Sequence, residues 1–228
     1  MKSSRIKISF YLNIVIFLLV LMATIFMITG FHFMSDDIVL DATKLSAFKF
    51  FTVDSNIFMG IMALIFAIYE YQIIDKKSKK IPEKIYVLKL VSTTSVMLTF
   101  LVTVLYLAPY AKTGFFSMFQ NSNLFFHLII PVLSLITFIF FENKNLKFKY
   151  TFYGLIPTFF YAIFYVINIL THLENGKISF KYDWYGFAQG GINTIGIIFT
   201  LMHIITYVIT LIIWFLNRKL GYDGISKI

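Results

Sequence analysis

The stretch ISFYLNIVIFLLVLMATIFMITGFHFMS, residues 8–35, contains no Asp, Glu, Lys or Arg and is long enough to cross a membrane as one helix. A helix needs about 20 apolar residues to span the hydrocarbon core, and a charge at its centre costs several kcal/mol. Further stretches of the same kind lie at 50–69, which contains only Asp54, and at 90–111, 113–141, 150–173 and 184–217. These stretches predict six membrane-spanning helices, at about residues 8–30, 50–74, 85–107, 122–141, 151–171 and 192–216.

The composition supports this interpretation over a soluble fold. Hydrophobic residues make up 59% of the 228 residues, charged residues 14%, and the mean hydropathy is +0.81, whereas soluble domains have about 45–50% apolar and about 25% charged residues. No Gly/Ser linker or low-complexity tract separates the spans. The sequence therefore predicts an all-α integral membrane protein with one six-helix domain over residues 1–228. It has no cysteine, which excludes disulfides and thiol nucleophiles.

The net charge of +9 is explained by topology rather than by a nucleic-acid partner. Fourteen Lys and Arg residues lie in segments on one side of the predicted membrane, namely 2–7, 76–84, 144–149 and the tail after 216. Five lie on the other side, at positions 44, 49, 112, 177 and 181. By the positive-inside rule both termini are predicted to be cytoplasmic, which requires an even number of spans.

Polar side chains within the spans carry the functional argument, because each must find a partner, water or a substrate. In the outer half they are Asp54, Asn56, His127 and Asn168, with Thr52 and Asn123 nearby. Thr52 and Asn56 share one helix face, and so do Asn123 and His127. Pro131 removes a backbone hydrogen bond one turn below His127 and is expected to bend that helix. We expect a polar cavity near the outer leaflet.

The depth of Thr52 depends on where the second span begins. Asp54-Ser55-Asn56 resembles Asn121-Ser122-Asn123, and both segments are expected to cap helix starts. If Asp54 caps the second span, Thr52 lies outside the helix, and His127 lies on the order of 12 Å deeper. If Ser46 caps a longer span, Thr52 and His127 come level. A histidine within hydrogen-bond reach of a threonine can act as its base in attack on an ester.

Two of these segments resemble a known family. Residues 48–54, FKFFTVD, are similar to an early segment of the androgen-induced gene 1 protein and its relative, the androgen-dependent TFPI-regulating protein. Residues 123–127, NLFFH, followed by Pro131, resemble a second segment of that family. Its members are multi-span hydrolases of fatty acid esters of hydroxy fatty acids. The resemblance implies that Thr52 is the nucleophile and His127 the general base, with no cofactor, and that membrane lipid and a hydrophobic ester are its partners.

Several surrounding residues are expected to assist such chemistry. Asn56 or Asn123 is a candidate donor to the oxyanion, and Asp54 or Asn123 a candidate to orient His127. Trp184 is expected as an interfacial anchor or as part of a lid. Outer loops 31–47, with Asp36, Asp37 and Asp41, and 172–191 are the candidate lids. His172 is expected to approach Asp183 or the cavity mouth.

An alternative remains open, in which the protein is not an enzyme. A small transporter, lipid-binding protein or assembly factor would use the same polar residues to line a passage or to join helices. Glu70 and Lys89, near the inner ends of consecutive spans, are expected to pair or to reach toward water. The four scattered histidines have no metal-ligand spacing, so no metal site is predicted. The Lys-, Ile-, Phe- and Asn-rich composition suggests a bacterial plasma membrane. Oligomeric state is not predicted.

Overall fold

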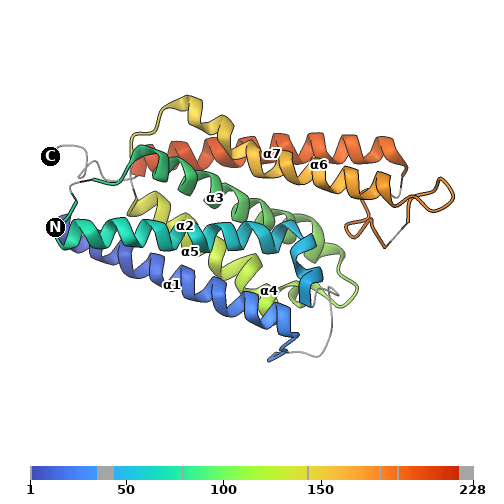
Figure 1. Cartoon of the computed structure of the whole chain (residues 1–228), viewed down its shortest axis with the longest axis horizontal. Helices are drawn as coiled ribbons and strands as arrows, with labels where there is room; N and C mark the ends of the chain where they lie inside the picture. The colour runs from blue at the N-terminus through green and yellow to red at the C-terminus, as the bar shows by residue number, and fades with distance from the viewer. Residues whose placement is uncertain are drawn as a thin grey trace.

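The computed structural model describes residues 2–34, 44–78, 80–142, 144–179, 181–188 and 190–220. Six helical stretches in this part of the chain are long and apolar enough to cross a membrane, and they run alongside one another in a bundle (Figure 1). The described residues contain no β-strand beyond one isolated bridge between Glu174 and Lys177. The predicted all-α membrane fold with six spans is therefore confirmed.

The spans have the following bounds. α1 is Lys2–Thr29, α2 Phe51–Ile74, α3 Glu83–Val102, α5 Ile130–Phe140, α6 Ile156–Thr171 and α7 Ile192–Leu220. α3 continues through the π-helical η2, Thr103–Leu107, into η3, Ala108–Tyr110; α5 follows the short α4, Ser122–Leu124, and the π-helical η5, Phe125–Ile129. The 3₁₀-helices η1, η4 and η6 are Lys44–Lys49, Phe115–Phe119 and Phe148–Leu155.

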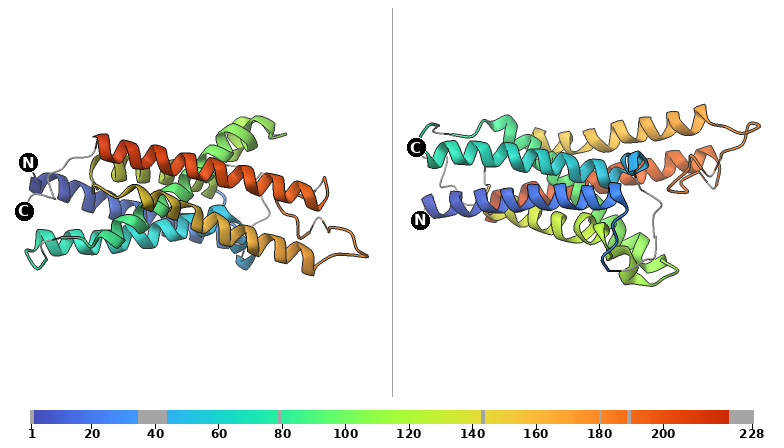
Figure 2. Two further views of the ribbon diagram at one scale, coloured as in Figure 1. Left: turned by 90° about the horizontal axis from the view of Figure 1, so that it is seen from above. Right: turned by 60° about the horizontal axis from the view of Figure 1, so that its bottom comes forward.

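α3 is the central helix of the bundle. It contacts α2 on one side and α5, α6 and α7 on others, while α1 packs against α2 (Figure 2). The buried share of the most apolar part of each span is 61% in the span of α3. It is 22% in the spans of α1, α6 and α7. The peripheral helices instead expose large apolar side chains, among them Leu18, Phe160 and Ile197. Because soluble proteins rarely expose such continuous apolar surface, these faces are suited to contact lipid.

Two ends of the bundle are distinguished below. The amino-terminal end holds the start of α1, the end of α2 and the start of α3. The far end holds the end of α1, the start of α2, and the loops that precede α4 and α7 (Figure 1). α1 ends at Gly30, whose φ of 70° lies in the left-handed region that glycine adopts without a steric penalty.

The two π-helical segments both precede prolines. Pro109 and Pro131 lack the N–H that would bond the carbonyl four residues earlier, which for Pro131 is the carbonyl of His127. His127 itself lies within the π-helical turn η5, and the expected bend at Pro131 stays a prediction. Single π-helical turns of this kind occur frequently at functional sites.

The predicted caps are wrong. α2 begins at Phe51, so Asp54 lies inside its first turns, and Ser46 belongs to the separate η1. No side-chain cap bonds the start of α2 or of α4. Asn121 instead accepts hydrogen bonds at Oδ1 from the backbone N–H groups of Phe33 and Met34, at 2.8 and 2.9 Å. The Asn121 side chain therefore holds the residues that follow α1 in place. This is a tertiary contact, which a local sequence pattern does not predict.

Candidate functional site

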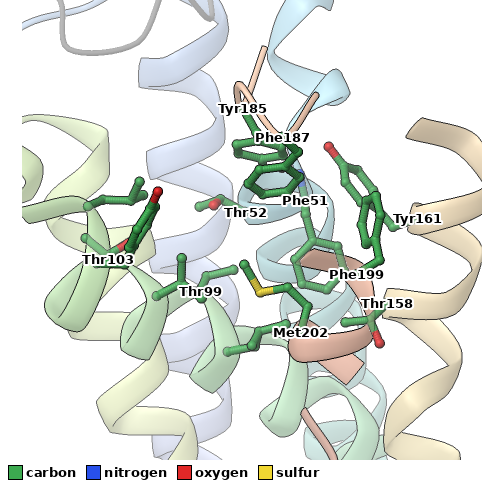
Figure 3. A pocket seen from close by; sticks show the side chains of 14 residues that line it. Phe51, Thr52, Thr99, Thr103, Thr158, Tyr161, Tyr185, Phe187, Phe199 and Met202 are labelled. Carbon is green, nitrogen blue, oxygen red and sulfur yellow. The ribbon is translucent and has the colours of Figure 1, made fainter. Parts of the chain in front are cut away.

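A partly open cavity lies at the far end of the bundle, between α2, α3, α6 and α7 (Figure 3). Its cavity volume is about 80 Å³, below the roughly 300–1,000 Å³ that is typical of small-molecule pockets. Its walls are largely apolar and aromatic. They are formed by Phe51, Thr52, Leu98, Thr99, Val102, Thr103, Tyr106, Leu107, Thr158, Tyr161, Tyr185, Phe187, Phe199 and Met202.

Thr52 is the predicted site residue that lines this cavity. It lies in the first turn of α2 and is half-buried. Thr99 and Thr158, on other walls, donate their hydroxyl protons to backbone carbonyls three residues earlier, at 2.7 and 3.0 Å. No hydrogen bond among the described residues involves the hydroxyl of Thr52 or of Thr103. The Thr52 hydroxyl is therefore available to a molecule in the cavity.

Aromatic residues hold the segment 181–188 over this end of α2. Tyr185 accepts a hydrogen bond at its hydroxyl from the backbone N–H of Phe51, at 3.0 Å. Tyr161 donates to the carbonyl of Lys49 at 2.6 Å and accepts from the indole N–H of Trp184 at 3.1 Å. Burial raises the pKa of the Tyr185 hydroxyl to about 12, so this group stays protonated at neutral pH. Trp184 thus belongs to the packing of this segment against α6.

Asp183 stabilises the same segment, residues 181–188, through two hydrogen bonds. It is buried, accepts the hydroxyl proton of Tyr165 at one oxygen and accepts from the backbone N–H of Ala188 at the other, at 3.0 Å. His172 does not approach it as expected, but stacks on Tyr182 with ring centroids 3.9 Å apart. The other candidate lid, with Asp36, Asp37 and Asp41, falls outside the described residues.

His127 is buried within η5 and does not line the cavity. Its Nδ1 lies 3.0 Å from the carbonyl oxygen of Met118. Because a carbonyl can only accept, the neutral ring carries its proton on Nδ1, which leaves Nε2 as the acceptor. The ring is thus oriented by a backbone carbonyl of η4, whereas Asp54 or Asn123 was expected to do this.

Asn56 joins the Thr52 and His127 segments. Its amide Nδ2 donates to the carbonyl of Thr52 at 2.8 Å and to the carbonyl of Phe126, which precedes His127, at 3.3 Å. Both amide protons are therefore used, and Asn56 does not have one left for an oxyanion. Thr52 lies one helical turn before Asn56, roughly 6 Å along α2. Among the described residues no hydrogen bond joins Thr52 to His127.

The other predicted site residues lie apart from the cavity. Asp54 is exposed and faces a groove between α2 and α6, lined also by Phe58 and Pro157. Asn123 is buried with its Oδ1 unpartnered. Asn168 donates to the carbonyl of Tyr182 at 3.2 Å and so holds the loop that precedes α7. The described residues contain no group of three or more acidic, histidine or cysteine side chains that fits a metal ion.

A second polar cluster lies within the bundle at the amino-terminal end. Lys89, fully buried, pairs with Glu142 at 3.3 Å between Nζ and Oε1, rather than with Glu70. Glu70 joins the cluster through Asn13, whose Nδ2 donates to it at 3.2 Å. The expected Glu70–Lys89 pair is therefore wrong in its partner. The signal that was missed is Asn13, an amide near the start of a charge-free span.

No family model, curated protein or solved structure matches this chain. The site is therefore interpreted from its own geometry.

Proposed function

We propose that the protein hydrolyses a membrane lipid ester whose acyl chain lies in the far-end cavity, with Thr52 as nucleophile and His127 as base. The observation that carries this proposal is the Thr52 hydroxyl, which lines an apolar cavity and makes no hydrogen bond among the described residues. Phe51, Phe199 and Met202 offer the apolar walls that an acyl chain requires. The similarity of residues 48–54 and 123–127 to the androgen-induced gene 1 protein family supports the same assignment.

The chemistry is nucleophilic acyl transfer. The Thr52 hydroxyl attacks the ester carbonyl and His127 Nε2 takes its proton, so that a tetrahedral oxyanion forms. The oxyanion collapses, the C–O bond to the alcohol breaks, and His127 returns the proton to the leaving alkoxide. Water then attacks the acyl-threonine ester as His127 takes one of its protons, the bond between the acyl carbon and the Thr52 oxygen breaks, and the fatty acid leaves as His127 returns the proton to Thr52. The proposal requires Thr52 and His127 to come within reach, directly or through one bound water, when substrate binds, as catalytic contacts often tighten only with substrate.

Lipid binding without chemistry is the second candidate. It is favoured by the lack of a Thr52–His127 hydrogen bond among the described residues and by the use of both Asn56 amide protons in the fold. In that case the cavity holds a lipid chain and the Thr52 hydroxyl only hydrogen-bonds its ester carbonyl.

Hydrolysis of fatty acid esters by the purified protein in lipid nanodiscs distinguishes the two. Wild type is compared with Thr52→Ala, Thr52→Ser and His127→Ala, and with Thr171→Ala, an exposed threonine of α6 that does not line the cavity, as a control. We expect wild type, Thr52→Ser and Thr171→Ala to release fatty acid. Thr52→Ala and His127→Ala should lose at least about 100-fold, since the nucleophile or the base is missing.

The outcomes separate the candidates. Equal release by all five proteins contradicts the assignment of Thr52 and His127. No release by any of them, together with one lipid retained per wild-type chain and lost on Phe199→Trp, which fills the cavity, favours lipid binding alone.

A further inference from the structure

The polar cluster at the amino-terminal end is independent of the cavity and connects four parts of the fold. Asn13 of α1, Glu70 of α2, Lys89 of α3 and Glu142, just after α5, are each 3% exposed or less. The amide of Asn13 donates to Glu142 Oε1 at 2.7 Å and to Glu70 Oε2 at 3.2 Å. Its Oδ1 accepts from the ammonium group of Lys89. Asn13 is therefore the bridge between all three ionisable groups.

The cluster has one carboxyl group more than it has cations. Lys89 supplies one positive charge, and Glu70 and Glu142 supply two carboxyl groups, so both in ionised form leave a net charge of −1. A net charge in a buried, weakly polarisable site is very unfavourable, and such a site normally neutralises by binding a proton. The Lys89 ammonium group contacts Glu142 Oε1 and Asn13 Oδ1.

Two further atoms of the cluster have no hydrogen-bond partner among the described residues. Glu142 Oε2 and the Tyr86 hydroxyl are both buried without a hydrogen bond, and their residues are each 1% exposed. The charges of Glu142 and Glu70 both act on the Tyr86 hydroxyl. A buried, charged carboxylate oxygen without a donor is costly, and protonation removes its charge. Burial also raises the pKa of Glu142, against the opposing effects of Lys89 and Asn13.

Among the described residues, Lys89 is the cation found to act on the two carboxyl groups. On α1, Ser9 faces the cluster, 3.5 Å from Asn13 Nδ2, and Arg5 lies one turn earlier. After α5, Lys144 lies over the ring of Tyr86, 5.7 Å from its centroid. On α7, Asn217 donates to the backbone carbonyl of Glu142 at 3.3 Å.

We propose that Glu70 and Glu142 together form a binding site for one proton, which at neutral pH makes their cluster with Lys89 electrically neutral. The proton belongs to the coupled pair rather than to either residue. Its release in alkaline solution leaves an uncompensated negative charge between α1, α2, α3 and the end of α5. Binding of the proton therefore stabilises the packing of these helices, and its release weakens that packing.

The proposal has a thermodynamic consequence with a definite sign. The folded protein holds a proton that the unfolded chain releases above the ordinary glutamate range, near pH 4.3. Between that pH and the pH at which the folded site loses its proton, the native state binds one proton more, so stability falls as pH rises. The unfolding equilibrium constant should increase about tenfold per pH unit across this window.

Infrared spectroscopy of the full chain in nanodiscs tests the site directly. The carbonyl stretch of a buried protonated carboxyl is followed from about pH 5 to about pH 10, across the range in which the site would titrate. Variants Glu70→Gln and Glu142→Gln are compared with Glu174→Gln, an exposed carboxyl in the far-end loop. We expect one titrating band in wild type and in Glu174→Gln. Each cluster variant should lack it, because the remaining carboxylate then pairs with Lys89 as a neutral unit.

If a cluster variant fails to fold, the infrared spectrum of wild type alone still tests the proposal. Absence of a protonated carboxyl at neutral pH in wild type overturns the proposal, and so does a band that persists in both cluster variants. A band that appears only when sodium is replaced by choline also overturns it, because a metal cation would then be the resident ligand. Loss of the tenfold-per-unit slope in Glu142→Gln but not in Glu174→Gln supports it.

Discussion

Replacement of Lys89 by methionine is the sharpest test of the buried cluster. Methionine keeps the length and apolar stem of the side chain but removes the ammonium group, which bonds Asn13 and lies 3.3 Å from Glu142 Oε1. The Lys89 side chain is 0% exposed, so water does not replace these contacts. Removal of one partner from a buried ion pair typically costs about 3–5 kcal/mol, because the other charge stays behind.

We therefore expect Lys89→Met to lower the free energy of unfolding by about 3–5 kcal/mol. The measurement is reversible unfolding in bicelles by titration with sodium dodecyl sulfate, followed by tryptophan fluorescence. Lys84→Met, an exposed lysine on the same helix, serves as the control and should change stability by under about 0.5 kcal/mol. The double variant Lys89→Met/Glu142→Gln should be more stable than Lys89→Met, since it removes the unpaired carboxylate.

A loss of less than about 1 kcal/mol in Lys89→Met would refute the reasoning. So would a double variant in which the two losses simply add, because residues in one ion-pair network should be coupled.

Three further predictions concern packing and the loop that precedes α7. Gly154→Ala should destabilise the protein by about 1–3 kcal/mol in thermal unfolding, because its Cβ would lie 2.2 Å from Thr210 Oγ1 on α7. The control Gly196→Ala should be tolerated, because nothing lies within 4 Å of its Cβ. Tyr161→Phe should cost about 1–2 kcal/mol and speed hydrogen exchange in residues 181–188, since its two hydrogen bonds are lost; unchanged exchange would contradict this. The Tyr185 phenolate should be missing from absorbance spectra until about pH 12, and since unfolded tyrosine ionises near pH 10, stability should fall as pH rises from about 10 to 12.

The six spans could be predicted from the sequence because the membrane imposes a simple requirement. A continuous run of apolar residues must form a helix to satisfy its backbone in lipid, and the predicted spans match the helices to within a few residues at most ends. The main difference is the start of α1, at Lys2 rather than near residue 8. Lysine and arginine are good helix formers, so the helix continues past the apolar run.

The candidate site could be predicted only in part. The sequence places Thr52, Asn56 and His127 in the outer half of the bundle and offsets Asp54 from Thr52 around α2, and in the structure Asp54 faces the groove toward α6. It does not indicate that the Met118 carbonyl orients His127, because that contact depends on how the 3₁₀-turn before α4 folds back.

The ion pair of Lys89 could not be predicted from the sequence for the same reason. Glu142 is 53 residues from Lys89 and follows the end of α5, whereas Glu70 is in the adjacent span. Proximity along the chain favours Glu70, but the rotation of each helix about its axis decides the partner. Asn13, which bridges the groups, lies on a third helix whose rotation a charge-free sequence does not specify.

Covalent capture of Thr52 tests the central claim most directly. A long-chain fluorophosphonate, which resembles a lipid ester and reacts with activated hydroxyl nucleophiles, is incubated with the protein in nanodiscs, and the intact mass and labelled peptide are measured. The account predicts one probe per wild-type chain on the peptide containing Thr52, no label in Thr52→Ala and strongly slowed labelling in His127→Ala. An unlabelled wild type, or equal labelling of wild type and Thr52→Ala, would contradict it.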